Sequence, residues 1–256
     1  MAINKDKNPA LQLCGVSKTF HTDKGTNVKV LEDVNLCVYP GQFVTLLGTT
    51  GCGKTTLLNL IAGLDIPDNG SLRYGDDLHF GKNIGYVFQQ YTLFPWRTTL
   101  RNVSFGLQMR GIPHNERKKK AHELLIKVGL GGFEKAYPHE LSGGMRQRAA
   151  IAQALAIEPK LLLMDEPFGA LDDSTRTELQ QILTELWNES RATIVFVTHN
   201  IDEALILGDK VFVFSQRPGT IMREFKIDLP RPRDRMAKEF TNLFIDIRKS
   251  LSDQLD

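Results

Sequence analysis

A glycine-rich segment early in the chain contains the residue types needed to bind phosphate. Positions 48–55 match the pattern G-x-x-x-x-G-K-[ST] and read Gly48, Thr49, Thr50, Gly51, Cys52, Gly53, Lys54 and Thr55, with Thr56 next. Glycines in such a loop let backbone N–H groups close around an anion at a helix N-terminus. Lys54 would reach the β- and γ-phosphates, and the Thr55 hydroxyl would bind Mg²⁺. The spacing therefore predicts a nucleotide site.

Two carboxylates that follow an apolar run could supply hydrolytic chemistry. Residues 161–164 have the length and composition of a buried parallel strand, and Asp165 and Glu166 come directly after it. Because open α/β sheets bind ligands at the carboxyl ends of their strands, we expect both at the edge that carries the phosphate loop. Asp165 could hold Mg²⁺, and Glu166 could polarise the attacking water. The alternative is an exposed cap on a helix beginning near Leu171, which the nearby phosphate loop makes the weaker interpretation.

A histidine and a second helix start have more than one interpretation. An apolar run at 193–198 ends next to His199, which could donate a hydrogen bond to a γ-phosphate or could be a core histidine. Taken by itself, the core interpretation is favoured. Ser142, Gly143 and Gly144 open a helix and form a second anion-binding helix end. This end is either a plain cap or a site for a nucleotide held by another subunit, and the residues alone do not decide.

The elements that must position these residues follow an α/β pattern. Beta-prone stretches at 11–16, 30–38 and 42–47 predict an N-terminal sheet that leads into a buried strand. Residues 54–62 predict the helix after the loop, ended by a glycine. Residues 114–157 show helical spacing and predict an inserted helical subdomain.

Composition narrows the classes of protein. The 256 residues carry a formal net charge of +2, from 32 basic and 30 acidic residues, which argues against a nucleic-acid partner. Three cysteines, Cys14, Cys37 and Cys52, match neither a disulfide framework nor a zinc site. The N-terminal residues lack the apolar stretch of a signal peptide, and no run of about 18 apolar residues could span a membrane. We expect partners to hold the protein at any membrane where it works.

Taken in order, these motifs resemble those of the ATP-binding subunits of ABC transporters. Residues 141–148, Leu-Ser-Gly-Gly-Met-Arg-Gln-Arg, resemble that family's signature motif. By this resemblance, Phe20 stacks on adenine, Gln89 senses Mg²⁺ and the attacking water, and His199 is the switch histidine. Residues 169–172, Gly-Ala-Leu-Asp, resemble the loop that communicates across a dimer.

The resemblance implies one ABC ATPase domain over residues 1–256. It would be a P-loop NTPase core with an N-terminal antiparallel β subdomain, a helical signalling subdomain at about 90–158 and a helical tail at about 230–256. Family behaviour implies a head-to-tail dimer, in which Ser142 and Gly144 of one subunit close over ATP held by residues 51–56 of the other. ATP hydrolysis would drive separate transmembrane permease subunits at the cytoplasmic face of the cell membrane, fed by an extracytoplasmic solute-binding protein.

Three segments look like the nitrate, sulfonate and taurine importer branch of the family: 94–96 (Phe-Pro-Trp), 217–219 (Arg-Pro-Gly) and 228–233 (Asp-Leu-Pro-Arg-Pro-Arg). The solute would then be a small anion of that kind. Trp96 is expected in an exposed loop that takes a partner helix, with a buried Trp96 as the alternative. Competing functions are a soluble ABC ATPase not tied to transport, a P-loop kinase, and a binding module without turnover.

Overall fold

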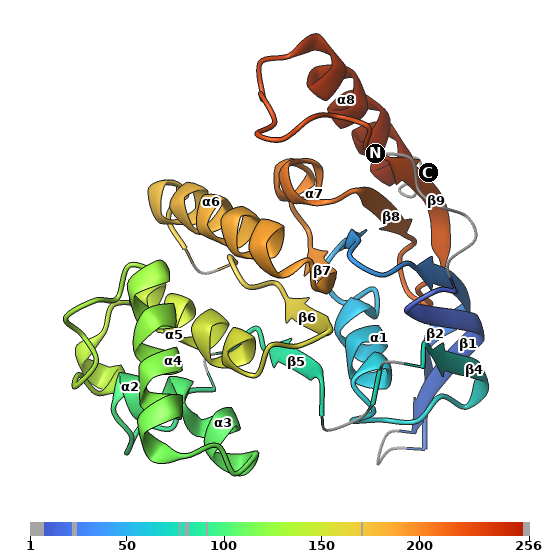
Figure 1. The fold of residues 1–256 in the computed structure, drawn as a ribbon. Helices are drawn as coiled ribbons and strands as arrows, with labels where there is room; N and C mark the ends of the chain where they lie inside the picture. The colour runs from blue at the N-terminus through green and yellow to red at the C-terminus, as the bar shows by residue number, and fades with distance from the viewer. Residues whose placement is uncertain are drawn as a thin grey trace. The chain divides into compact units, whose positions relative to one another are not determined.

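The computed structural model describes residues 8–21, 25–76, 78–79, 82–90, 92–169 and 171–252, and the chain divides into two compact units. Unit 1 combines residues 1–81 with residues 192–256, and unit 2 is residues 82–191. Figure 1 shows helices and strands in both units. The predicted α/β class is confirmed.

An antiparallel sheet forms the first part of unit 1. It contains β1 (Leu11–His21), β2 (Asn27–Val38) and β4 (Asn69–Tyr74), in the order β2-β1-β4. Leu11, Leu13 and Val16 of β1 are buried, whereas residues between them are partly exposed, as expected for a sheet with one face on a core. The antiparallel β subdomain is therefore confirmed.

Parallel strands make up the buried centre of unit 1. β3 (Phe43–Leu47) lies between β7 (Thr193–Thr198) and β8 (Lys210–Phe214) and runs parallel to both. β9 (Ile221–Lys226) pairs antiparallel with β8. Every residue of β3 and β7 is buried. This explains why both read as unbroken apolar runs rather than as alternating patterns.

The described part of unit 1 also contains three helices. They are α1 (Lys54–Ile61), α7 (Ile201–Leu207) and α8 (Lys238–Ser252). α7 packs against β3 and against α8, which follows the last strand and closes an apolar cluster with Phe225 and Ile227. Residues 253–256, which follow α8, lie outside the described part of the chain.

Unit 2 is mostly helical. Its strands β5 (Ile84–Val87) and β6 (Leu161–Asp165) pair in parallel. Its helices are α2 (Thr99–Val103), α3 (Phe105–Met109), α4 (His114–Lys127), α5 (Gly143–Ala156) and α6 (Asp173–Ser190), with a short 3-10 turn at Pro138–Glu140.

Small side chains let the helices of unit 2 approach closely. Ala149, Ala150 and Ala152 of α5 are buried, and α5 packs against α2, α3, α4 and β5. The inserted helical subdomain is therefore confirmed. Within the described ranges, no helix combines the length and the apolar character needed to cross a membrane.

Candidate functional site

The glycine-rich loop joins a buried strand to a helix, as its sequence predicts. β3 ends at Leu47 and α1 begins at Lys54. Gly51 has φ +82° and Gly53, the N-cap residue of α1, has φ +106°, backbone conformations that favour glycine. A Cβ on Gly53 would also lie 2.8 Å from Leu31 Cδ2 and 2.9 Å from the carbonyl oxygen of Val30. This position therefore requires glycine for both its conformation and its packing.

Lys54 places a cation inside the loop. Its side chain is only 3% exposed, and Nζ donates hydrogen bonds to the carbonyl oxygens of Gly48 and Thr49, both at 2.8 Å. Thr49 and Thr55 are exposed, as is the Thr50-Gly51 segment between the buried parts of the loop. A fixed ammonium, backbone N–H groups of a helix start and an accessible hydroxyl suit a phosphate chain.

Gly219 packs closely against the phosphate loop, a contact that the sequence did not reveal. Its N–H donates to the carbonyl of Val30 at 2.8 Å, and its carbonyl accepts from the N–H of Glu32 at 3.0 Å. A Cβ on Gly219 would lie 2.1 Å from the carbonyl oxygen of Cys52. In the sequence, residues 217–219 were noted only for their resemblance to one branch of importers, and nothing there indicated an approach to the phosphate loop.

Phe20 offers an aromatic surface in unit 1. It lies near the end of β1 and is 41% exposed. Lys18 Nζ lies 5.3 Å from the centroid of its ring and donates hydrogen bonds to Asp65 and to the carbonyl of Ile66, both at 2.7 Å. A cation against the ring restrains it and leaves an exposed aromatic of the kind that a nucleotide base can stack on.

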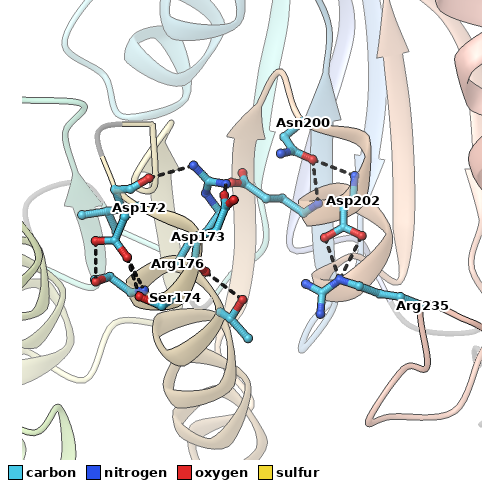
Figure 2. A network of polar contacts seen from close by, with 11 residues as sticks. Asp172, Asp173, Ser174, Arg176, Asn200, Asp202 and Arg235 are labelled. Atoms are coloured by element: carbon cyan, nitrogen blue, oxygen red, sulfur yellow. Dashed lines mark hydrogen bonds and ion pairs between the residues drawn. The ribbon is translucent and has the colours of Figure 1, made fainter.

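His199 is exposed, so the core interpretation of this histidine is wrong. The residues on either side hold its backbone. The buried Thr198 hydroxyl donates to the Glu203 carboxylate at 2.6 Å and accepts from the N–H of Asn200 at 3.0 Å. Asn200 caps α7 by accepting from the N–H groups of Asp202 and Glu203 (Figure 2). The end of a rigid strand and a capped helix therefore fix the position of His199.

Unit 2 carries the two carboxylates at the end of β6. Asp165 is 3% exposed, and Glu166 is partly exposed with φ +41°, a conformation that costs energy for a residue with a side chain. The Glu166 carbonyl accepts from the N–H of Gly169 at 3.1 Å, which turns the chain away from the strand. Burial raises the pKa of Tyr86, on neighbouring β5, and the charge of Asp165 raises it further. Asp165 thus imposes a negative potential on this strand end.

The Ser-Gly-Gly segment begins α5. The Ser142 hydroxyl is the N-cap and accepts from the N–H of Met145 at 3.2 Å. Ser142 is exposed, while a Cβ on Gly144 would lie 2.6 Å from Thr175 Cγ2 on α6. Ser142 therefore caps α5. Because this helix start is exposed, it could also bind an anion.

A carboxylate at the start of α6 organises the loop after Glu166. Asp172 accepts from the Ser174 hydroxyl at 2.6 Å, and from the N–H and hydroxyl of Thr175 at 2.9 and 2.8 Å (Figure 2). These hydrogen bonds, that of Ser174 first, hold the pKa of Asp172 well below its usual value. Arg176 donates to the carbonyl of Leu171 at 2.8 Å. Of the predicted 169–172 loop, residue 170 lies outside the described residues.

The predicted site residues divide between the units. Unit 1 contains the phosphate loop, Phe20 and His199, and unit 2 contains Ser142, Gly143, Gly144, Gln89, Asp165 and Glu166. Gln89 is exposed after β5. Thr55, Gln89 and Asp165 offer the oxygen ligands that Mg²⁺ prefers. The described residues contain no cluster of three or more His, Cys, Asp or Glu that could hold a metal by itself. Such a donor set suits a Mg²⁺ ion that arrives with nucleotide phosphates.

Comparison with known proteins identifies the family. Residues 31–169 match the family model described as ABC transporter. The nitrate import ATP-binding protein NrtD of Synechocystis sp. is 44% identical over 234 residues, which cover 89% of this chain and 88% of that protein. The aliphatic sulfonates import ATP-binding protein SsuB of Bacillus cereus is 42% identical over 243 residues, covering 94% of each.

Solved structures agree with the sequence comparison. Two dimeric structures of the ABC transporter cassette MJ0796, one of them bound to ADP and Pi, each have a TM-score of 0.76. They are 36% and 35% identical, and each match covers 86% of this chain and 100% of the other. The chain therefore belongs to the ABC transporter family, as an ATP-binding subunit with ATPase activity.

Proposed function

We propose that this ATPase powers an importer for a small anion of the nitrate, sulfonate or taurine kind, through separate membrane subunits. The observation that carries the proposal is the similarity to two import ATP-binding proteins over most of both chains. One relative is named for the import of nitrate and the other for the import of aliphatic sulfonates. A soluble ABC ATPase not tied to transport is the alternative.

In the proposed mechanism, unit 1 binds the nucleotide. Phe20 stacks on the base, and the backbone N–H groups from Gly48 to Thr56 surround the phosphate chain. Lys54, already held by two loop carbonyls, needs no large rearrangement to bond a phosphate oxygen. Its burial strengthens this charge-assisted contact.

The proposed hydrolytic step uses Glu166 and His199, each of which follows a buried strand. Glu166 accepts the proton of the attacking water, and His199 donates a hydrogen bond to the γ-phosphate. Thr55, Asp165 and Gln89 would hold Mg²⁺, which when bound neutralises charge on the phosphates. General-base catalysis of this kind contributes about 100- to 10,000-fold in rate.

Dimer formation completes the proposed site. The exposed start of α5 offers Ser142 and the N–H groups of Gly143 and Gly144 to a nucleotide held by a second copy, or by a homologous subunit. Support comes from the dimeric MJ0796 cassettes, which have the same fold and are 36% and 35% identical to this chain. ATP then joins the two subunits, and hydrolysis releases them.

A loop of unit 2 provides the proposed contact with the membrane subunit. Trp96 is 71% exposed, and the ring of Phe94 lies 5.5 Å from it. The fully buried Asn102 holds the loop by accepting from the N–H of Phe94 at 2.7 Å and donating to the carbonyl of Arg97 at 3.0 Å. An exposed aromatic on a fixed loop is well suited to a partner helix, because little ordering entropy is lost on binding. Through this contact the protein would be held at the cytoplasmic membrane surface.

The test is capture of the tagged protein from gently solubilised membranes of its source, followed by identification of its partners. We expect a multi-span membrane protein, recovered with the wild type and with N59Q, whose side chain is distant in sequence from the loop, but depleted with W96A. Recovery of ribosomal or DNA-processing factors, with ATPase activity intact, would favour the soluble ABC ATPase instead. Uptake of nitrate or of an alkyl sulfonate by vesicles containing the captured complex then identifies the solute.

A further inference from the structure

A segment rich in arginine ties the chain after β9 to α7. Arg231, Arg233 and Arg235 alternate with other residues between β9 and α8, and we name this segment the arginine strap. In Figure 1 the connection between β9 and α8 lies near α7, and all three segments belong to unit 1. All three guanidinium groups bond α7 or the residues just after it.

Two of the arginines bond the C-terminal end of α7. Arg233 Nη1 donates to the carbonyls of Leu205 and Gly208, the latter at 2.6 Å. Arg231 donates to the carbonyl of Leu207 and, at 2.6 Å, to the carboxylate of Asp209. The last carbonyls of a helix have no partner within the helix and carry its partial negative charge. Two guanidinium groups therefore satisfy the end of α7 by hydrogen bonding and by charge.

The third arginine bonds the first turn of α7. Arg235 Nε lies 3.0 and 2.9 Å from the two carboxylate oxygens of Asp202 (Figure 2). Asp202 also donates its N–H to the cap Asn200 at 2.8 Å. The strap therefore holds α7 at both ends.

Arg233 is the most deeply placed of the three. It is 9% exposed, and burial lowers its pKa to about 9, with Arg231 lowering it further and Asp209 opposing the shift. At neutral pH the group remains charged. Burying a charged guanidinium is costly unless its hydrogen bonds are satisfied. Those of Arg233 are satisfied by the carbonyls of Leu205 and Gly208 and, at 3.4 Å each, by those of Ile227 and Leu229. Arg233 therefore links the end of α7 to the segment that follows β9.

The helix held in this way begins at the Asn200 cap, directly after His199. His199 stands between β7 and α7, and its backbone position depends on Thr198, Asn200 and the Thr198–Glu203 hydrogen bond. Glu203 lies on α7. Any shift of α7 along its axis would move the Asn200 cap and the Glu203 carboxylate, and with them the imidazole.

We propose that the arginine strap positions His199 for ATP hydrolysis, with Arg233 as the principal positioning residue. This inference rests on the proposed role of His199. It gives segment 228–235, which the chemistry of the phosphate loop does not use, a part in turnover. The strap acts on the rate and not on nucleotide binding, because the side-chain hydrogen bonds described above are with α7, the residues just after α7 and the segment that follows β9, and none of these is with the phosphate loop.

The first test is steady-state ATP hydrolysis by the whole chain with R233M. Methionine keeps most of the side-chain volume but removes the charge and all the donors. We expect kcat to fall by about 10-fold and the KM for ATP to stay within about 2-fold, since misplacing a catalytic group by a fraction of an ångström has effects of this order. R223M is the matched control. Arg223 is also an arginine of unit 1, but it donates to Ser250 on α8 and not to α7.

The decisive readout is the same substitution in the H199A background. If Arg233 acts through His199, R233M should change the residual kcat of H199A by less than about 2-fold, because the two effects are coupled. A merely structural role of Arg233 would lower kcat by the same factor in both backgrounds. Such an equal loss would overturn the proposal.

A milder variant covers the case in which R233M does not fold. R235Q removes the ion pair between the strap and Asp202, on a partly exposed pair. We expect R235Q and D202N to lower kcat by similar factors of about 2- to 5-fold, and the double variant to be no worse than either, as for two partners of one interaction. Unchanged kcat in both single variants would overturn the proposal. If H199A itself left kcat unchanged, the proposed role of His199 would fail instead, whatever the strap variants did.

Discussion

Replacing Gly219 by alanine should damage the phosphate loop although Gly219 lies far from it in sequence. The new methyl group would lie 2.1 Å from the carbonyl oxygen of Cys52, whereas Cβ contacts below 3.0 Å are essentially absent from real proteins. The methyl carbon and the oxygen must therefore separate by about 0.9 Å, the difference between the two distances. The Gly219 side cannot easily move, because its N–H and carbonyl both bond β2, to Val30 and Glu32. The phosphate loop must therefore shift.

The size of the effect follows from these contacts. Overpacking that shifts backbone costs about 1–3 kcal/mol of folding stability. A loop displaced by this amount would also lose about one charge-assisted hydrogen bond to a phosphate, about 1.5–3 kcal/mol. At about 1.4 kcal/mol per tenfold, the Kd for ATP should rise by about 10- to 100-fold.

The assay measures both quantities on the same protein. Isothermal titration with ATP under non-hydrolysing conditions gives the Kd, and urea unfolding gives the free energy of unfolding. G131A is the control, because a Cβ on Gly131 would meet only Ile126 Cγ1, at an ordinary 3.6 Å. We expect G131A to change stability by less than about 0.5 kcal/mol and ATP affinity not at all. Wild-type affinity and stability in G219A would refute the reasoning, since the clash would then be relieved elsewhere.

Other predictions concern the charged groups. E166Q should bind ATP, stabilise the dimer and lose most hydrolysis, by about 100- to 10,000-fold; phosphate release at the wild-type rate would remove Glu166 as the base. K54A should weaken nucleotide binding itself, measured by the same titration, and unchanged affinity would contradict the cradle assignment. The hydrogen bonds that lower the pKa of Asp172 add stability above its ordinary pKa of 3.8, and this stability is lost as pH falls below that value. As pH falls below about 5, the free energy of unfolding should therefore decrease less in D172N than in the wild type. Acid titrations followed by circular dichroism measure this difference, and identical profiles would exclude the contribution of Asp172.

The sequence predicts those parts of the fold that local patterns determine. β3, β6 and β7 could be located because strands buried on both faces are unbroken apolar runs. The phosphate loop could be located because its chemistry depends on residues adjacent in sequence.

Other features depend on contacts between distant residues, and no local pattern reveals them. The approach of Gly219 to Cys52 joins residues far apart in the chain. The same holds for Arg233 and its acceptors on α7, although the alternating arginines were visible as a motif. His199 was misjudged when taken by itself, because whether a histidine after a strand is exposed depends on the turn that follows, here set by the Asn200 cap.

Glu166 and His199 each lie one residue beyond a buried strand, which separates stability from chemistry at these two positions. β3, β6 and β7 are buried throughout, and the exposed or half-buried residues begin where each strand ends. At the end of β6 the backbone adopts a costly conformation, φ +41° at Glu166. Strain of this kind persists only where the surrounding structure is over-determined, and the buried strands supply that support. Substitutions inside the strands should therefore lower stability first, and substitutions just after them should lower turnover first.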